Sequence, residues 1–502
     1  MPRISFRSFI TILAWLGILS TALFAQETDA HRLVGAMLGD SPLEEDLQEL
    51  ADQIGGRATG SEANLKSVEW ALAKFKTAGI DARKEGFMMP ALWLERSASA
   101  RVEGEANYDV RVACMPFSTA VPPMPGLSAA TTPQAAVTAA LVDGGFGAED
   151  DFIRLGEKAR GAFALIETHE LIDLDGLFKE YADAVGIEQR AFAAGVSGVV
   201  YMGSRSRNVL YRHNASLGPQ NKHPLLVMER DAAMRTLRLL RAGKSLNLTA
   251  KIDVNSGPAY ESYNVVGEIK GTKSPEEFVV IGAHLDAWDL GDGALDNGCN
   301  VALVIDLARQ IKRLGLKPLR TIRFALFNGE EQGLIGSWGY TKTHVNEMDR
   351  TVMASSYDIG TGRIIGFFTG GRPEVAAAVD RALAPVQGLG PFTQIDAPIV
   401  GTDNFDFMME GVGNLVANQE SANYGPNYHA RSDTYDKVDL KQLRLNAAIA
   451  AAVTYGFATM PVNWKRQSRE EVENLINTTD LGAQMKSFNV WNDWAEGKRG
   501  RQ

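Results

Sequence analysis

Residue types that bind metal ions are concentrated in one short stretch, residues 278–298. An apolar run at its start, residues 278–283, predicts a buried strand followed by a turn-rich loop. One histidine and four aspartates come at the expected strand end and in the loop after it: His284, Asp286, Asp289, Asp292 and Asp296. Because open α/β sheets bind ligands outside the carboxyl ends of their strands, this stretch predicts a metal site. The alternative is a charged surface loop in which Asp-Gly pairs form turns.

Three later segments supply further metal-binding side chains in comparable positions. A second apolar run, residues 321–327, is followed by Glu330 and Glu331. A third predicted strand ends on Asp358, and a loop rich in glycine, proline and asparagine carries His429. Alternating strands and helices predict a largely parallel sheet with right-handed connections. Three strand ends and one later loop should therefore bring these side chains to one edge of that sheet.

Two imidazoles and three carboxylates suit a pair of zinc ions. The five expected ligands are His284, Asp296, Glu331, Asp358 and His429. With Asp296 bridging, two ions roughly 3.5–4 Å apart would hold a hydroxide that attacks a substrate carbonyl. Glu330 is then the candidate general base, and Asp286 is placed to orient the imidazole of His284. Cobalt and manganese are alternatives, because similar ligands bind them.

Residues 54–461 resemble the aminopeptidase S and carboxypeptidase Q-like family of di-zinc exopeptidases. The matching motifs are IGGRATGSEAN, AHLDAWDLGDGALDNG, FNGEEQGLIGS, SSYDIG, GTDNFDF and YHARSDT. The resemblance implies the same five ligands, a base–ligand pair at Glu330 and Glu331, a cis peptide bond between Asp296 and Asn297, and a homodimer. Cys299 departs from the small residue usual at its position. A buried side chain is the expectation there, and a zinc thiolate is the alternative.

Length and composition exclude several other classes of protein. The 502 residues predict two or three domains, and contents of 45% hydrophobic and 22% charged residues are typical of globular proteins. A net charge of −10 argues against nucleic acid or an anionic membrane as the main partner. The two cysteines, Cys114 and Cys299, exclude a disulfide scaffold and match no thiolate zinc spacing.

The first 25 residues predict an export signal. Arg3 and Arg7 precede an apolar stretch, residues 9–24, and Ala25 offers a cleavage point. The alternative is an uncleaved membrane anchor, since the apolar length nearly suffices to cross a bilayer. Cleavage would give an exported protein, periplasmic or extracellular, without a stable membrane anchor.

The order of predicted elements indicates an α/β fold with an insert. A mixed, largely parallel central sheet flanked by helices is expected from residues 26–95 and 256–465, which the resemblance identifies as a zinc exopeptidase fold. Residues 96–255 contain short apolar strands and no cluster of catalytic residue types. Their pattern, including GAFALIE and AFAAGVSGVVYM, resembles the protease-associated domain, a β-rich insert. Residues 466–502 are expected to form a C-terminal tail.

Two classes of function are compatible with these observations. The resemblance implies a secreted di-zinc exopeptidase for short unblocked peptides, either a dipeptidase or carboxypeptidase or an aminopeptidase of the same family. The other class is a binding module that keeps a peptidase fold without its activity. All five expected ligands and Glu330 are present. This favours the enzyme, because a degenerate copy should have lost at least one of them.

Overall fold

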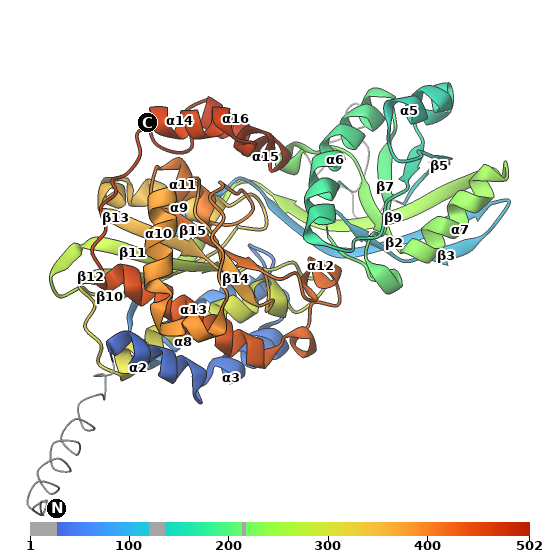
Figure 1. The fold of residues 1–502 in the computed structure, drawn as a ribbon. Helices are drawn as coiled ribbons and strands as arrows, with labels where there is room; N and C mark the ends of the chain where they lie inside the picture. Colours follow the sequence, from blue (N-terminus) through green and yellow to red (C-terminus); the bar gives the residue numbers. More distant parts are fainter. Residues whose placement is uncertain (1–27, 120–135, 213–216) are drawn as a thin grey trace, which may run out of the picture.

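The chain folds around two β-sheets that lie side by side (Figure 1). The structure is a computed structural model and describes residues 28–119, 136–212 and 217–502. The predicted export signal, residues 1–25, lies outside the described residues. Within the described ranges, no helix has the length and apolar character needed to cross a bilayer.

Seven strands form the first sheet, in the order β1-β10-β12-β11-β13-β15-β14. The four strands β12, β11, β13 and β15 pair in parallel, whereas the outer strands β1, β10 and β14 pair antiparallel with their neighbours. The bounds are β1 (Asp81–Met89), β10 (Tyr260–Ile269), β11 (Ser274–His284), β12 (Arg320–Phe327), β13 (Thr351–Ser356), β14 (Ile364–Phe368) and β15 (Asn414–Gln419). The predicted mixed sheet with a parallel centre is confirmed.

Helices cover both faces of this sheet, which explains why β11 and β12 are continuous apolar runs. One face packs against α8 and α13, with α2, α3, α4 and α10 beside them, and the other packs against α9 and α11. The bounds are α2 (Asp29–Leu38), α3 (Leu43–Glu49), α4 (Glu62–Thr77), α8 (Cys299–Arg313), α9 (Ile335–Thr343), α10 (Pro373–Ala382), α11 (Asn404–Met409) and α13 (Leu440–Thr459). The early helices therefore pack with the segments that carry the expected metal ligands.

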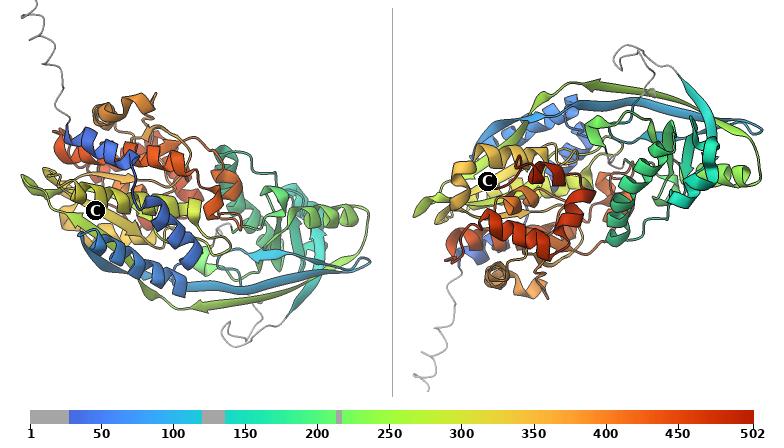
Figure 2. Two further views of the ribbon diagram at one scale, coloured as in Figure 1. Left: turned by 90° about the horizontal axis from the view of Figure 1, so that it is seen from below. Right: turned by 90° about the horizontal axis from the view of Figure 1, so that it is seen from above.

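Eight strands form the second sheet, in the order β3-β2-β9-β5-β6-β7-β8-β4. The strands are β2 (Leu92–Gly104), β3 (Tyr108–Val110), β4 (Val112–Cys114), β5 (Val137–Asp143), β6 (Phe163–Ile166), β7 (Gly198–Met202), β8 (Leu225–Met228) and β9 (Leu246–Gly257). The helices among them are α5 (Glu149–Leu155), α6 (Leu174–Ala193) and α7 (Arg230–Arg241). Figure 2 shows this part extending to one side of the first sheet and its helices.

The boundaries of this second part differ from the prediction. Strand β1 belongs to the first sheet and β2 to the second. Farther along the chain, β9 belongs to the second sheet and β10 to the first. The predicted limits at residues 95 and 255 therefore fall inside strands, because β2 and β9 form one continuous antiparallel ribbon. We call residues 92–257 the insert. Its likeness to a protease-associated domain stays a prediction.

The C-terminal residues form helices where a tail was predicted. They contain α14 (Arg469–Thr478), α15 (Leu481–Ser487) and α16 (Trp491–Ala495). Their apolar side chains join a buried cluster with Phe405, Met408 and Met409 of α11. The prediction of a tail is therefore wrong. These short helices are polar on their exposed faces, and their apolar stripes pack on α11 beside the first sheet.

Candidate functional site

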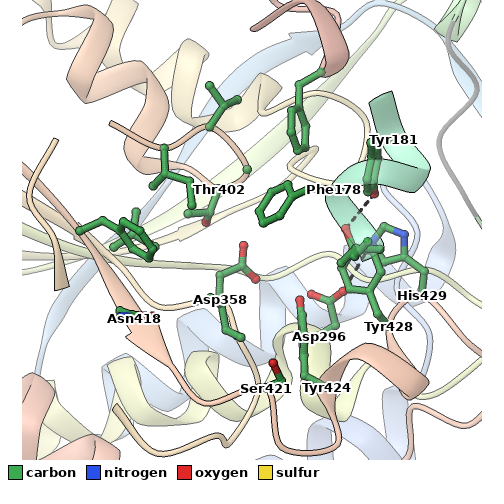
Figure 3. A pocket seen from close by; sticks show the side chains of 18 of the residues that line it. Phe178, Tyr181, Asp296, Asp358, Thr402, Asn418, Ser421, Tyr424, Tyr428 and His429 are labelled. Carbon is green, nitrogen blue, oxygen red and sulfur yellow. Dashed lines mark hydrogen bonds and ion pairs between the residues drawn. The ribbon is translucent and has the colours of Figure 1, made fainter. Parts of the chain in front are cut away.

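The ends of the central strands deliver the predicted metal-binding residues to one edge of the first sheet. His284 is the last residue of β11. Glu330 is the third residue after the end of β12, and Glu331 is next to it. Asp358 comes two residues after β13. His429 lies in the loop that follows β15 and the short helix α12 (Tyr424–Asn427). Figure 3 shows Asp296, Asp358 and His429 facing one another.

His284 forms one group of three side chains with Asp296 and Asp358. Its Nε2 atom lies 2.8 Å from Oδ1 of Asp358 and 3.1 Å from Oδ1 of Asp296. All three residues are buried. These separations place one nitrogen and two carboxylate oxygens around a common point.

His429 forms a second group of three side chains with Glu331 and Asp296. Its Nε2 atom lies 2.7 Å from Oε2 of Glu331 and 3.4 Å from Oδ2 of Asp296. The two oxygens of Asp296 therefore face different histidines. A carboxylate in this position can bridge two metal ions, as the sequence predicts for Asp296.

Several buried atoms of these groups lack a hydrogen-bond partner among the described residues. They are Oδ2 of Asp296, Oε1 of Glu331 and Nδ1 of His429. Ligand atoms of His284, Asp296 and Glu331 lie within 4.8 Å of one another. Burial, together with the neighbouring carboxylate of Asp296, raises the pKa of Glu331 well above its usual range. A bound divalent cation would satisfy the carboxylate oxygens of Asp296 and Glu331 and offset their repulsion, so the residues fit the metal pair expected from the sequence.

Glu330 lies beside the ligands and lines the same cavity as His284, Asp296 and Asp358. Burial, with the added repulsion of Asp358 and Glu331, raises the pKa of Glu330 well above its usual range, although His284 opposes this. Glu330 therefore lies where its carboxylate could accept a proton from a water molecule held beside the ligands.

Asp286 supports His284 in a different way from the one predicted. Nδ1 of His284 is 3.0 Å from the main-chain carbonyl oxygen of Asp286, but 3.7 Å from its carboxylate oxygen Oδ1, which is too long for a hydrogen bond. The other carboxylate oxygen, Oδ2, accepts hydrogen bonds from the Thr59 hydroxyl and the Gly329 amide. The main-chain carbonyl of Asp286 therefore orients the imidazole. The Asp286 carboxylate links its own loop to the segments of Thr59 and Gly329.

Arg57 supports the ligand loop and was not predicted to do so. Its guanidinium is fully buried and donates hydrogen bonds to the carbonyls of Leu285, Asp292 and Gly293, at 2.8, 2.8 and 2.9 Å. Arg57 lies within the quoted motif IGGRATGSEAN, whose residue types alone do not show which carbonyls it binds. Arg57 fixes the backbone between His284 and Asp296.

Replacing Arg57 with methionine should lower the free energy of unfolding by about 3 kcal/mol or more, because several buried carbonyls lose a charged donor. Urea denaturation of the metal-loaded protein would measure the change. Arg154→Met is the matched control, since Arg154 is exposed and pairs only with Asp151 in the same helix. A loss for Arg57→Met as small as that of the control would contradict a supporting role.

Asp433 is a second support that the sequence analysis missed, although it lies within the quoted motif YHARSDT. Its carboxylate accepts hydrogen bonds from the amides of Leu295 and Asp296, at 2.7 and 3.1 Å. Burial raises the pKa of Asp433 to about 7. These bonds hold the backbone of the bridging residue.

Two expectations from the resemblance can be compared with the structure directly. The peptide bond between Asp296 and Asn297 is cis, as expected. The Cys299 thiol is buried in the first turn of α8 and contacts the carbonyl of Leu295 at 3.3 Å. Cys299 therefore packs in the interior and does not join the two ligand groups.

A cavity of about 360 Å³ opens beside the ligand groups. Its walls away from the ligands are largely apolar and include Ile359, Phe368, Ile399 and Val416. The insert contributes Phe178 and Tyr181 of α6, which lie over the ligands in Figure 3. Phe488, after α15, packs on both rings, with centroids 6.4 and 5.1 Å away. The insert and the segment after α15 thus form part of the cavity, although no sequence pattern indicates this.

Charged groups around the site are unevenly distributed. Asp173 and Asp175 line the cavity, and none of the described residues that line it is a lysine or arginine. A second hollow of about 660 Å³ meets the site at Glu330 and His429 and is lined by Lys498, among others. The first cavity therefore favours a cationic or apolar group, and a basic side chain is available only in the second.

Comparison with known proteins identifies the region that carries the site. Residues 264–454 match the family model described as peptidase family M28. Carboxypeptidase Q of Xenopus laevis is 33% identical over 230 residues, which cover 46% of this chain and 49% of that protein. A probable lipoprotein aminopeptidase of Mycobacterium tuberculosis is 30% identical over 247 residues, covering 42% and 48%. The chain thus spans about half the length of the curated relatives it matches.

Solved structures agree with this assignment over most of the chain. A peptidase M28 precursor from Shewanella amazonensis superposes with a TM-score of 0.74 at 26% identity, covering 87% of this chain and 98% of that one. An aminopeptidase from an Aneurinibacillus species, at 22% identity and a TM-score of 0.61 with coverage of 88% and 100%, shares the fold. The matched residues 264–454 include the segments that hold all five expected ligands, so this region of the chain is similar to peptidase family M28.

Proposed function

We propose that the protein is a di-zinc exopeptidase that hydrolyses short peptides with a free amino terminus. The observation that carries this proposal is the pair of ligand groups, one at His284 and one at His429, that share the two oxygens of Asp296. Similar proteins are described as a zinc aminopeptidase from Bacillus subtilis and as carboxypeptidase Q, which supports zinc and peptide chemistry.

The residues of the chain divide the work of hydrolysis. Bound zinc ions would supply Lewis acidity for the scissile carbonyl and the attacking water. The ligand groups at His284 and His429 would hold the ions at fixed places. Glu330, in the cavity wall, would accept a proton from the water and return it to the leaving amine. The rings of Phe178 and Phe488 would exclude water from the bound residue.

The charges around the site favour recognition of the amino end. A carboxypeptidase needs a cation for the terminal carboxylate, and the described residues that line the first cavity include no lysine or arginine. An N-terminal residue would therefore place its side chain among Ile359, Phe368 and Val416. A carboxypeptidase is the second candidate, because Lys498 in the second hollow could meet a carboxylate.

Metal analysis, together with activity assays on three kinds of substrate, would test the proposal. We expect two zinc ions per chain, loss of activity with a chelator, and its return with added zinc. Free dipeptides and aminoacyl anilides should be cleaved, and N-acetylated dipeptides should resist. Cleavage of N-acetylated dipeptides but not of anilides would favour the carboxypeptidase. A zinc-loaded protein that cleaves none of these would instead be a binding module.

We also propose that the protein acts after export. The support is the N-terminal pattern of Arg3, Arg7 and the apolar residues 9–24. Protein secreted by an expressing cell should begin at Gln26 when its N-terminus is sequenced. A mature chain that still begins with the apolar residues would point to the uncleaved anchor.

A further inference from the structure

The loop that carries His429 lies against a segment of the insert, residues 210–212. Tyr211 and Ala430 form an antiparallel bridge. The amide of Arg212 donates to the carbonyl of His429 at 3.0 Å, and the amide of Arg431 donates to the carbonyl of Leu210 at 2.9 Å. The insert therefore holds the backbone at this histidine and at the two residues that follow it.

His429 needs such support because its backbone is in an unfavourable conformation. Its φ is +56°, a left-handed value that residues other than glycine rarely adopt. A residue in that region persists only where its surroundings hold it. The ring of Trp288 gives further support, since it packs edge-on against the His429 imidazole with centroids 6.2 Å apart.

The side chain of Arg212 reaches a second ligand loop. Its guanidinium is 1% exposed, and Nε donates to Oδ1 of Asp289 at 2.7 Å. Asp289 lies in the loop between His284 and Asp296. The Nη1 atom donates to Oε2 of Glu95 and to the carbonyl of Cys114, both at 2.8 Å. Arg212 thus contacts the His429 loop through its main chain and the His284–Asp296 loop through its side chain.

The three acceptors of Arg212 come from three separate segments, so its guanidinium joins parts of the chain that are distant in sequence. Two of the acceptors are carboxylates in a largely buried setting, where an ion pair with several hydrogen bonds is rigid. Arg212 therefore adds a link between the two ligand loops from the insert, beside the hydrogen bonds that Asp433 makes with Leu295 and Asp296.

We infer that Arg212 is a positioning residue that helps to fix the separation of His429 from the His284–Asp296 loop, so that the insert contributes to zinc affinity at the His429–Glu331 group. This inference rests on the proposed zinc binding. Partners that orient metal ligands typically account for 10–100-fold in metal affinity. Loss of the Arg212 side chain should weaken one zinc equivalent by that factor and leave the other bound.

The test measures Zn²⁺ binding to the full chain by competition with a chromophoric chelator. Arg212→Met should weaken one of two zinc equivalents about 10–100-fold, and Arg212→Lys should give an intermediate loss, because one ammonium group cannot reach all three acceptors. The absorption spectrum of the Co²⁺-loaded protein should change for the same variants, since it reports ligand geometry. Arg241→Met is the matched control, because Arg241 is half-exposed and pairs within the insert with Asp143 and Glu167.

A second variant guards against misfolding of Arg212→Met. Asp289→Ala removes the same contact from the other side, at a side chain that is 29% exposed, and should also weaken one zinc equivalent. If Arg212→Met unfolds in the presence of chelator, Asp289→Ala decides the question. Wild-type zinc affinity in the folded variants, with two ions bound by the wild type, would overturn the positioning role alone. A wild type that binds no zinc would overturn the proposed function as well.

Discussion

Replacing Glu330 with glutamine should lower kcat on the order of 10²–10⁴-fold while the zinc content stays unchanged. Glutamine keeps the size and polarity of the side chain and removes the carboxylate that would accept a proton from water. Glu330 lines the cavity but lies outside the two ligand groups. We therefore expect KM to change little, because the loss concerns the chemical step.

The adjacent glutamate provides the comparison for this experiment. Glu331 is 2.7 Å from Nε2 of His429, so Glu331→Gln should lower zinc content as well as activity. Elemental analysis and steady-state kinetics on both variants would separate the two roles. The alternative role for Glu330, capping a helix, has no support in the structure, since α9 begins at Ile335 without a side-chain cap. Near wild-type turnover by a zinc-loaded Glu330→Gln variant would remove this residue from the mechanism.

Replacing Asp296 with asparagine should remove at least one zinc ion and lower kcat/KM on the order of 10³-fold or more. The two oxygens of Asp296 lie 3.1 Å and 3.4 Å from the Nε2 atoms of His284 and His429. Asparagine has one acceptor oxygen and no charge, so it cannot bridge two cations. Loss of one ion removes several kcal/mol of stabilisation from the transition state, and about 4 kcal/mol corresponds to 10³-fold in rate.

The same substitution at Asp292 is the matched control. Asp292 lies in the same loop, four residues before Asp296, and its main-chain atoms bind Asp433 and Arg57. Because its carboxylate is not part of either ligand group, Asp292→Asn should keep two zinc ions and most of the activity. Zinc titration by calorimetry would compare the two variants. Two tightly bound ions in Asp296→Asn would show that this residue only hydrogen-bonds the histidines.

The sequence predicted the core of the fold well because its signals there are local. The apolar runs at residues 278–283 and 321–327 lie in β11 and β12, as predicted. Strands buried on both faces read as continuous apolar runs, which a window of a few residues can detect. The metal-binding residues lie just after those strands, at the edge where a parallel sheet brings the carboxyl ends of its strands together.

Contacts between distant segments had no such local signal. Arg57 is 236 positions from Gly293, whose carbonyl it binds, and Arg212 is 77 positions from Asp289. The sequence showed these arginines only as single charged residues in turns. The orientation of His284 by a carbonyl, rather than by the Asp286 carboxylate, was equally undetectable, because it depends on a few tenths of an ångström.

By itself, the sequence determined which side chains could hold metal and which strands carry them, since residue type and hydrophobic period are properties of short segments. Only the tertiary structure decided which oxygen of Asp296 faces which histidine, where the insert begins, and how the C-terminal helices pack. It also decided that Phe178 of the insert and Phe488 of the C-terminal region meet over the cavity. Such contacts depend on how whole layers pack against each other, and packing is set by the shape of surfaces that no short segment specifies.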